Sequence, residues 1–460
     1  MPRLPRPTLI RHAITLAASL TIPMTIAMSA VAATNPVPAY PETRKGDVAE
    51  VQFGEKIADP YRWLENDVRS DKDVADWVKR QSAVTETYLA SLPSHAWFAR
   101  RIRELMDYER FGLPQKAGTR YFYTRNSGLQ NQAQLLVRKG LDGKPVLLLD
   151  PNTWAKDGAT ALDAWVPSHD GRTLAYSVQD GGSDWRTIRV LDVRTGKPLA
   201  DEIKWAKFTE IAWVGNSGFL YSRFPEPEAG AAFQSLNTHQ TVYFHRIGTA
   251  QAADELVYST PDQPELGHSA QVTYDNRWAL ITTAKGTDSK YELHVISLAG
   301  GRHKWTAQPL VTGLNFDWRL IEGMGDALYF ITNKDAPRLR VVRMDLRRPA
   351  AEALSPVIAE RAETLERAQI VGNRLILSYL KDAASTAEVV SLDGKPVQEI
   401  TLSAIGTASG FSGRPGDPET FYSFSSFNQP SAIFRFDSQT GKTDPFALPK
   451  LAFNPADYLV

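Results

Sequence analysis

The chain has 460 residues, of which 43% are hydrophobic and 23% charged, fractions that are ordinary for a globular protein and exclude bulk disorder. Lysines and arginines together number 52, as do aspartates and glutamates, so the charge balance gives no reason to expect nucleic acid as a partner. The chain has no cysteine, which excludes disulfides, a cysteine nucleophile and thiolate metal sites.

Residues 1–32 have the pattern of a secretory signal peptide. A basic start precedes the apolar, uncharged stretch from Ala13 to Val31, and Ala30-Val31-Ala32 offers a small-residue cleavage site. The alternative is a transmembrane anchor, which Pro23 and the proline-rich segment after the cleavage site disfavour. We therefore expect an exported protein, periplasmic or extracellular, with no membrane partner after cleavage.

Residues 33–115 predict an N-terminal helical extension. Ser70 is placed to cap a helix, with Asp73 in the capping-box position. Apolar residues then recur at helical spacing from Val74 to Leu92, where Pro93 ends the pattern. A second helix is expected to follow, with these apolar side chains on one face: Phe98, Ile102, Leu105 and Met106. Both helices are amphipathic, so we expect their apolar faces to pack against another part of the protein.

Residues 116–448 change to short strands separated by turns. Strands rich in β-branched and aromatic residues recur about every 50 residues, each with a partner strand and polar turns. The residues that mark successive copies are Tyr121, Ala175, Leu220, Ala279, Tyr329, Ile376 and Tyr422. This period predicts a mainly β fold: a seven-bladed β-propeller of four-stranded antiparallel blades with an N-terminal α-helical extension.

No catalytic centre is visible in the sequence. A G-x-S-x-G nucleophile turn is approached at Ser183, Ser217 and Ser412, but each lacks the final glycine, and we interpret all three as hairpin turns. His239 and His245 are expected on one face of a strand, without a third ligand nearby. We therefore expect no catalytic residue, metal or cofactor in this chain.

Six motifs occur in an order that resembles one protein family. They are Asp59-Pro-Tyr-Arg-Trp-Leu-Glu65, Gly128-Leu-Gln-Asn-Gln132, Gly182-Ser-Asp-Trp-Arg-Thr-Ile188, Trp205-Ala-Lys-Phe208, His239-Gln240 through Gly248-Thr249, and Asn454-Pro-Ala-Asp-Tyr458. Together they resemble the N-terminal and propeller regions of the prolyl oligopeptidase family of serine peptidases, over essentially all of the chain after the signal.

The resemblance implies an architecture of which this chain is one portion. In the family, the N-terminal helices fold with a C-terminal α/β-hydrolase domain that carries the Ser-Asp-His triad. The propeller covers that active site and admits only short peptides, which are cleaved after proline. Residues 449–460 would begin the linker back to the hydrolase domain, so we expect a truncated, monomeric gating portion that is inactive alone.

One substrate-binding residue can be carried over from the resemblance. Phe208 falls on an aromatic position that lines the family's pocket, although a buried strand aromatic is the alternative. An arginine that the family uses nearby aligns with Ala284, beside Lys285, which puts that contact in doubt.

Two other functions remain open. A stand-alone exported propeller could act as a binding module, or the chain could assemble with a separately encoded hydrolase domain. Exposure of Trp77, Val78 and Tyr88 would favour the truncated portion over the binding module, because a self-sufficient module should not expose such apolar surface.

Overall fold

The computed structural model describes residues 39–300, 305–348 and 354–460, so the predicted signal peptide at 1–32 lies outside the described residues. The chain divides into two compact units. Of the described residues, 39–63 and 68–92 form the smaller unit, and 64–67 together with those from 93 to 460 form the larger.

The smaller unit consists of a hairpin and a long helix. Strands β1 (Ala49–Gln52) and β2 (Glu55–Ala58) pair in antiparallel fashion, and helix α1 spans Lys72–Ser91. A short 3-10 helix, η1 (Arg62–Glu65), stands between them in the chain.

The N-terminus of α1 differs from the prediction. Its cap is Asp71, whose side chain accepts hydrogen bonds from the backbone N–H groups of Asp73 and Val74, at 2.9 and 3.2 Å. Ser70 lies one residue too early, because only the residue adjoining the first helical turn can reach those N–H groups. The helix stops at Ser91, and Leu92, before Pro93, is extended.

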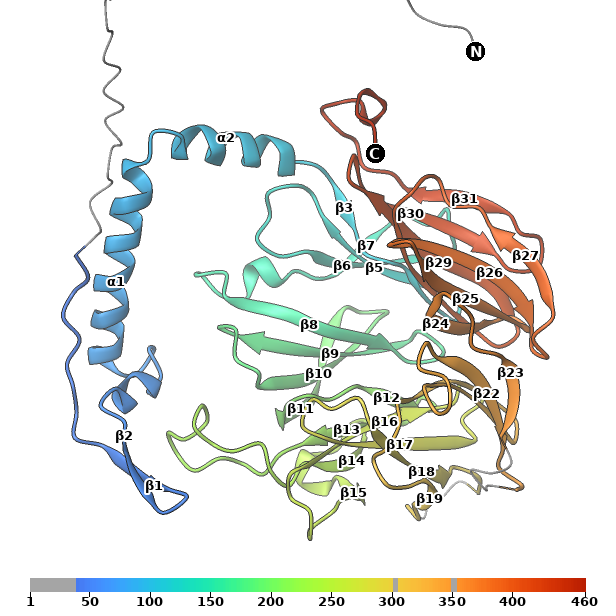
Figure 1. The fold of residues 1–460 in the computed structure, drawn as a ribbon, viewed down its shortest axis with the longest axis horizontal. Coiled ribbons are helices and arrows are strands. Elements are labelled where there is room, and N and C mark those ends of the chain that lie inside the picture. Colours follow the sequence, from blue (N-terminus) through green and yellow to red (C-terminus); the bar gives the residue numbers. More distant parts are fainter. Residues whose placement is uncertain (1–38, 301–304, 349–353) are drawn as a thin grey trace, which may run out of the picture. The chain divides into compact units, whose positions relative to one another are not determined.

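From residue 93 onward, the larger unit contains α2 (His95–Met106) followed by strands that form successive sheets (Figure 1). The first sheet contains β3 (Arg110–Phe111), β4 (Gln115–Ala117), β5 (Arg120–Asn126), β6 (Gln134–Lys139) and β7 (Val146–Leu149). A 3-10 turn, η2 (Pro151–Thr153), leads into the next sheet.

That next sheet has eight strands. They are β8 (Thr160–Pro167), β9 (Thr173–Asp180), β10 (Arg186–Asp192), β11 (Lys197–Ala206), β12 (Ala212–Val214), β13 (Gly218–Arg223), β14 (Thr241–Arg246) and β15 (Glu255–Tyr258), with η3 (Gln251–Ala253) before the last.

Four sheets of four antiparallel strands complete the unit. The first two are β16 (Leu266–Val272), β17 (Trp278–Lys285), β18 (Tyr291–Ser297) and β19 (Gln308–Val311), and β20 (Trp318–Met324), β21 (Ala327–Thr332), β22 (Arg340–Asp345) and β23 (Ser355–Ile358). The last two are β24 (Thr364–Val371), β25 (Arg374–Lys381), β26 (Ala384–Ser391) and β27 (Pro396–Ile400), and β28 (Thr407–Arg414), β29 (Asp417–Ser426), β30 (Gln429–Asp437) and β31 (Thr443–Ala447). A 3-10 turn, η5 (Pro455–Asp457), lies near the end of the chain.

The prediction of seven separate four-stranded blades is wrong. Within the described residues the fold is a mainly β propeller with five separate blades of four or five strands, and β8–β15 form one continuous sheet. The two halves of that sheet join where Ala206 of β11 pairs with Arg223 of β13. Because β11 runs for ten residues, its end reaches β13, where the Phe224 N–H donates to the Trp205 carbonyl at 3.1 Å.

The hydrophobic core lies between neighbouring sheets. One cluster packs Ile331 and Val341 of one sheet against Leu365 and Leu377 of the next, all of them buried. Another joins the first and last sheets, where the rings of Tyr121 and Phe421 meet edge to face with centroids 6.0 Å apart. Burial between sheets therefore holds successive blades together.

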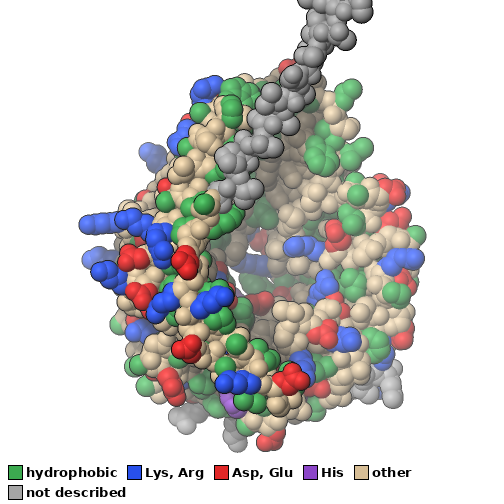
Figure 2. All heavy atoms as spheres, turned by 60° about the vertical axis from the view of Figure 1, so that its left-hand side comes forward, with side chains coloured by type: hydrophobic (Ala, Val, Ile, Leu, Met, Phe, Trp, Pro, Cys, Tyr) green, Lys and Arg blue, Asp and Glu red, His purple; other side chains and the backbone are tan. Residues whose placement is uncertain are grey.

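The surface drawn in Figure 2 carries lysine and arginine side chains interspersed with aspartate and glutamate. In the described part of the chain, no helix combines the length and apolar character needed to cross a membrane.

Candidate functional site

A cavity of about 460 Å³ opens beside the loop that follows β11. Its walls come from strands β16, β17 and β18 and from the loops that precede β12 and β14. It is lined by Phe208, Phe224, Asn237, Gln240, Glu265, Gly267, His268, Ser269, Thr282, Ala284, Gly286, Thr287 and Tyr291. Its volume is within the range of small-ligand sites.

Phe208 is displayed at this cavity by a strained loop. Its φ is 51° and that of Trp205, at the end of β11, is 61°, conformations that cost a non-glycine residue on the order of 1–3 kcal/mol each. The Phe208 side chain is 60% exposed and lies outside any strand. The alternative reading of Phe208 as a buried strand aromatic is therefore wrong.

Gln240 holds the strained loop in place. Its side-chain amide donates to the carbonyls of Lys207 and Phe208, at 3.0 and 3.2 Å. Its side-chain oxygen accepts from the backbone N–H of His268 at 2.7 Å, and the residue is only 4% exposed. Gln240 therefore connects the Phe208 loop to the wall of the cavity formed by β16.

Gly267 leaves space for the Gln240 side chain beside β16. A Cβ atom at this position would stand 3.0 Å from the Gln240 side-chain oxygen, tighter than ordinary packing. Gly267 pairs with Ala284 across the sheet, and Ala284 in turn pairs with Tyr291, so these three residues form one row of the cavity wall.

His268 is buried and neutral. Burial, reinforced by nearby His294, lowers the pKa of its imidazole to about 4. Its Nδ1 lies 2.9 Å from the Thr283 hydroxyl and its Nε2 lies 3.0 Å from the Thr260 hydroxyl. With both ring nitrogens bonded to hydroxyls, His268 serves as a structural wall residue and not as a general base.

A cation lies behind the aromatic side of the cavity. The Lys207 ammonium lies 4.7 Å from the ring centroid of Trp185 and 5.4 Å from that of Phe208, and Lys207 is 8% exposed. Trp185 meets Trp205 edge to face, and its indole N–H donates to the Ala232 carbonyl at 2.7 Å. The Gly182-Ser-Asp-Trp motif therefore supplies the platform for Lys207.

At the aligned arginine position the cavity has no cation. Ala284 lines the cavity with a methyl group, and the Lys285 ammonium lies 3.6 Å from the Glu265 carboxylate. An arginine-like contact is therefore missing from this wall, although Lys207 supplies a positive charge from another side.

The serine and histidine candidates are not assembled into a site. Ser183 lies in the loop between β9 and β10, and Ser217 lies between β12 and β13. Ser412 lies within β28 at a register shift, so its interpretation as a hairpin turn is wrong. The described residues contain no cluster of three or more potential ligands that could hold a metal ion.

The two histidines expected on one strand face are separated. His239 precedes β14 with a φ of 61°, and its backbone N–H donates to the Pro264 carbonyl at 2.7 Å. His245 is buried within β14, where its ring nitrogens lie 2.7 Å from Asp254 and 3.0 Å from Asp201.

Sequence reasoning missed Gln240, His268 and Tyr291 as parts of this cavity. Gln240 lies inside the His239-Gln240 motif, but nothing local in the sequence shows that its amide bonds to Lys207 and Phe208, which lie 33 and 32 residues away in the chain. His268 and Tyr291 lie in ordinary strands, and only the register of β16, β17 and β18 brings them together.

Comparison with known proteins identifies the family. Residues 40–449 match the model for the N-terminal β-propeller domain of prolyl oligopeptidase. The chain belongs to the prolyl oligopeptidase family. It is 35% identical to a prolyl endopeptidase of Elizabethkingia meningoseptica over 94% of this chain and 60% of the relative. The chain therefore spans about 60% of the length of that curated relative.

Solved structures in this family have the same fold. A structure from a study of two prolyl endopeptidases is 48% identical, with a TM-score of 0.71, over 91% of this chain and 60% of the other. Prolyl oligopeptidase B from Galerina marginata, bound to a 35-residue hydrolysis and macrocyclisation substrate, is 26% identical, with a TM-score of 0.78, over 91% of this chain and 62% of the other. The chain thus corresponds to the N-terminal and propeller portion of a prolyl oligopeptidase-like peptidase.

Proposed function

We propose that this propeller portion helps a serine endopeptidase to bind short peptides and cleave them after proline, with the Phe208 cavity as part of the peptide-binding surface. The observation that carries the proposal is the exposed Phe208 ring, held over a 460 Å³ cavity in a strained conformation by Gln240. Strained backbone maintained by surrounding hydrogen bonds is common at ligand sites.

The chemistry of the cavity fits a peptide that contains proline. Phe208, Phe224 and Tyr291 offer aromatic faces against which a pyrrolidine ring can pack, as in other proline-recognising sites. The hydroxyls of Ser269 and Thr282 offer hydrogen bonds to a peptide backbone.

Binding can be tested on the chain itself. A short fluorescent peptide with an internal proline is titrated against the purified protein and followed by anisotropy. Substitution Phe208→Ala should weaken binding about tenfold, the contribution expected of one well-packed aromatic contact. Phe427→Ala is the matched control, because Phe427 is fully exposed outside this cavity. Equal affinities of the two variants would contradict the assignment.

Cleavage would require the hydrolase domain that completes the family's architecture. There a serine attacks the prolyl carbonyl with histidine as the base, aspartate orients the histidine, and backbone donors hold the oxyanion. This chain limits which peptides reach the active site and forms part of the pocket wall. It acts as a monomer, and its first 32 residues direct its export. Turnover of a fluorogenic prolyl peptide by the purified 460-residue chain would contradict this division of labour.

The amount of exposed apolar surface distinguishes a stand-alone binding module from a portion that packs with a further domain. In α2, Trp97, Phe98 and Ile102 are 52%, 54% and 57% exposed. In the smaller unit, Val78 is exposed, whereas Trp77 and Tyr88 are half-buried. The exposed face of α2 favours the family architecture, in which a hydrolase domain packs with the N-terminal helices, over a self-sufficient module.

A further inference from the structure

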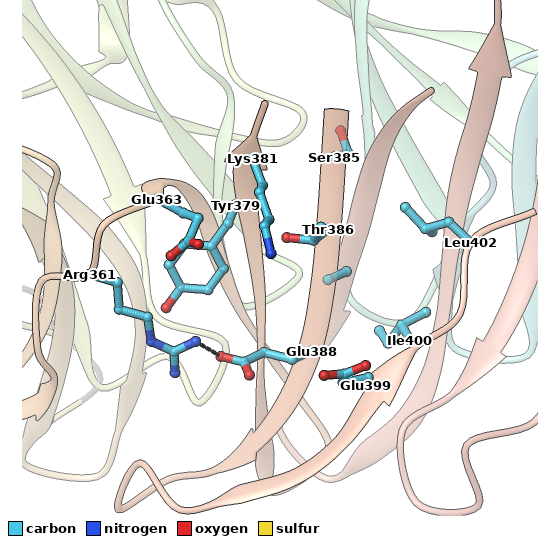
Figure 3. Close-up of a pocket in the computed structure, with 11 residues that line it drawn as sticks. Arg361, Glu363, Tyr379, Lys381, Ser385, Thr386, Glu388, Glu399, Ile400 and Leu402 are labelled. Carbon is cyan, nitrogen blue, oxygen red and sulfur yellow. Dashed lines mark ion pairs between the residues drawn. The ribbon is translucent and has the colours of Figure 1, made fainter. Parts of the chain in front are cut away.

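A second cavity, of about 390 Å³, lies at the sheet formed by β24–β27 and shares no lining residue with the Phe208 cavity (Figure 3). Tyr379 and Lys381 from β25 and Thr386 and Glu388 from β26 line it together with residues before β24 and along β27. Figure 3 shows Tyr379, Lys381 and Glu388 around this space, with the Glu388 carboxylate directed toward Arg361.

The Tyr379 side chain brings a buried hydroxyl to this cavity. Tyr379 is 5% exposed, and its hydroxyl is without a hydrogen-bond partner in the described part of the protein. The Arg361 guanidinium packs against the Tyr379 ring, 4.9 Å from its centroid, and leaves the hydroxyl free to donate. A buried hydroxyl without a partner lowers stability, so a ligand acceptor would compensate for its burial.

The charges around this hydroxyl are only partly compensated. Glu388 of β26 stands directly opposite Glu399 of β27, and like charges opposite each other in a sheet repel. The Arg361 guanidinium lies 2.7 Å from the Glu388 carboxylate and offsets that charge. Glu399 has no ion pair within the described ranges, so only the Glu388 charge of this opposed pair is neutralised.

Two further charged groups in the cavity are unpaired. Neither Lys381 nor Glu363 forms an ion pair with any described residue, and both line the cavity. Among the described residues, the cavity thus presents one unpaired ammonium and one hydroxyl without a hydrogen-bond partner, together with carboxylates that have only one basic partner. Ile400 and Leu402 add an apolar side to this polar surface.

We propose that this cavity binds the zwitterion of a free apolar amino acid or of a short apolar peptide. The ligand carboxylate would accept hydrogen bonds from the Lys381 ammonium and the Tyr379 hydroxyl, and its ammonium would lie among Glu363, Glu388 and Glu399. Its apolar side chain would contact Ile400 and Leu402. A simple anion such as phosphate is disfavoured by the three carboxylates, and a simple cation is disfavoured by Lys381 and Arg361.

Calorimetric titration of the chain tests the proposal with two probes, L-leucine and the dipeptide Ala-Leu. Saturable binding of either supports the site, and a preference between them identifies the source of the zwitterion. N-acetyl-leucinamide, which has the same side chain without either charge, should not bind. Equal binding of N-acetyl-leucinamide, or the absence of saturable binding by both probes, would overturn the proposal.

Matched variants locate the binding. Lys381→Met should weaken it about tenfold, as expected for the loss of a charge-assisted hydrogen bond, whereas Lys450→Met, at an exposed lysine outside the cavity, should not. Tyr379→Phe should weaken binding while leaving the unfolding temperature equal or higher, because it removes an unpaired buried hydroxyl. Unchanged affinity in both variants would contradict the assigned contacts.

This site is independent of peptide binding at the Phe208 cavity. Phe208→Ala should therefore leave the affinity for L-leucine unchanged, and a parallel loss would show that the zwitterion occupies the Phe208 cavity instead.

Discussion

The ammonium of Lys116 on β4 lies 3.0 Å from the carboxylate of Glu419 on β29, so a charged pair joins the first and last sheets of the larger unit. Asp417 adds a second carboxylate 2.8 Å from Lys116. Glu419 also accepts from the Tyr121 hydroxyl at 2.7 Å and from the Arg435 guanidinium, and its side chain is 6% exposed. This network lies at the junction where the propeller's two ends meet.

Replacement of Lys116 should weaken that junction. Lys116→Met leaves the buried Glu419 carboxylate with two partners in place of three and should lower the free energy of unfolding by about 1.5–3 kcal/mol, the range for hydrogen bonds to charged groups. Lys442→Met is the control, since Lys442 pairs with Asp444 at 2.9 Å on an exposed surface. Urea unfolding of both variants compares the two losses, and equal losses would contradict a special role for Lys116.

Acid should release the same junction. Burial alone would raise the pKa of Glu419, but hydrogen bonds from Tyr121, Arg435 and Lys116 hold it below its usual value of 4.5. The ionised carboxylate therefore stabilises the fold fully above pH 4.5, and this contribution is lost as pH falls through the lower pKa of the folded state. In Glu419→Gln, unfolding temperatures measured between pH 7 and the acid limit should fall less steeply than in the unsubstituted chain.

The buried cluster around His245 should give the opposite pH dependence. Burial lowers the pKa of His245, but hydrogen bonds to Asp254 and Asp201 outweigh it and raise the pKa above 6.5. The protonated imidazole thus stabilises the fold fully below pH 6.5, and this stabilisation is lost as pH rises through the raised pKa. The Tyr221 hydroxyl also donates to Asp254, at 2.7 Å.

Substitution of His245 tests this cluster. His245→Gln leaves two buried carboxylates without their cation and should cost on the order of 3–5 kcal/mol at pH 6. The loss relative to the unsubstituted chain should shrink as pH rises above 6.5, whereas His95→Gln, at an exposed position, should behave like the unsubstituted chain throughout. A loss that stays constant with pH would show that folding does not raise the pKa of His245.

The effect of Gln240 on the position of Phe208 can be measured separately from its effect on the stability of the fold. Gln240→Ala removes three hydrogen bonds and should cost about 1–3 kcal/mol, while proline-peptide affinity falls as Phe208 leaves its strained conformation. Gln263→Ala, at an exposed glutamine, is the control. Stability is measured by thermal unfolding and affinity by anisotropy well below the transition. Peptide affinity that is unchanged in folded Gln240→Ala would show that Gln240 does not position Phe208.

Local sequence patterns predicted much of the fold. The helical spacing from Val74 to Leu92 corresponds to α1, and the turn and strand signals around Tyr121 and Ala175 correspond to β5 and β9. These patterns depend on residues a few positions apart, which the sequence displays directly. The ordered motifs identified the family for the same reason.

Features that depend on distant residues could not be predicted. Whether β11 reaches β13 depends on where Ala206 lies relative to Arg223, and no periodicity encodes that contact. The exposure of Phe208 depends on a backbone conformation fixed by Gln240, and the unpaired Tyr379 hydroxyl is visible only once its surroundings are built. Local sequence patterns therefore predict helices and strands, whereas the arrangement of the cavity residues depends on how distant segments pair.

The continuity of β8–β15 has a mechanical consequence for how the propeller can flex. Main-chain hydrogen bonding at the end of β11 makes two repeat units move as one stiff segment, because separating them would break sheet pairing. The contacts of Glu419 with Lys116 and Tyr121 depend on an ionised carboxylate, whereas main-chain hydrogen bonds do not titrate. As pH falls, the larger unit should therefore become flexible unevenly. The strands β8–β15 should stay joined, whereas the junction between the first and last sheets at Glu419 should loosen.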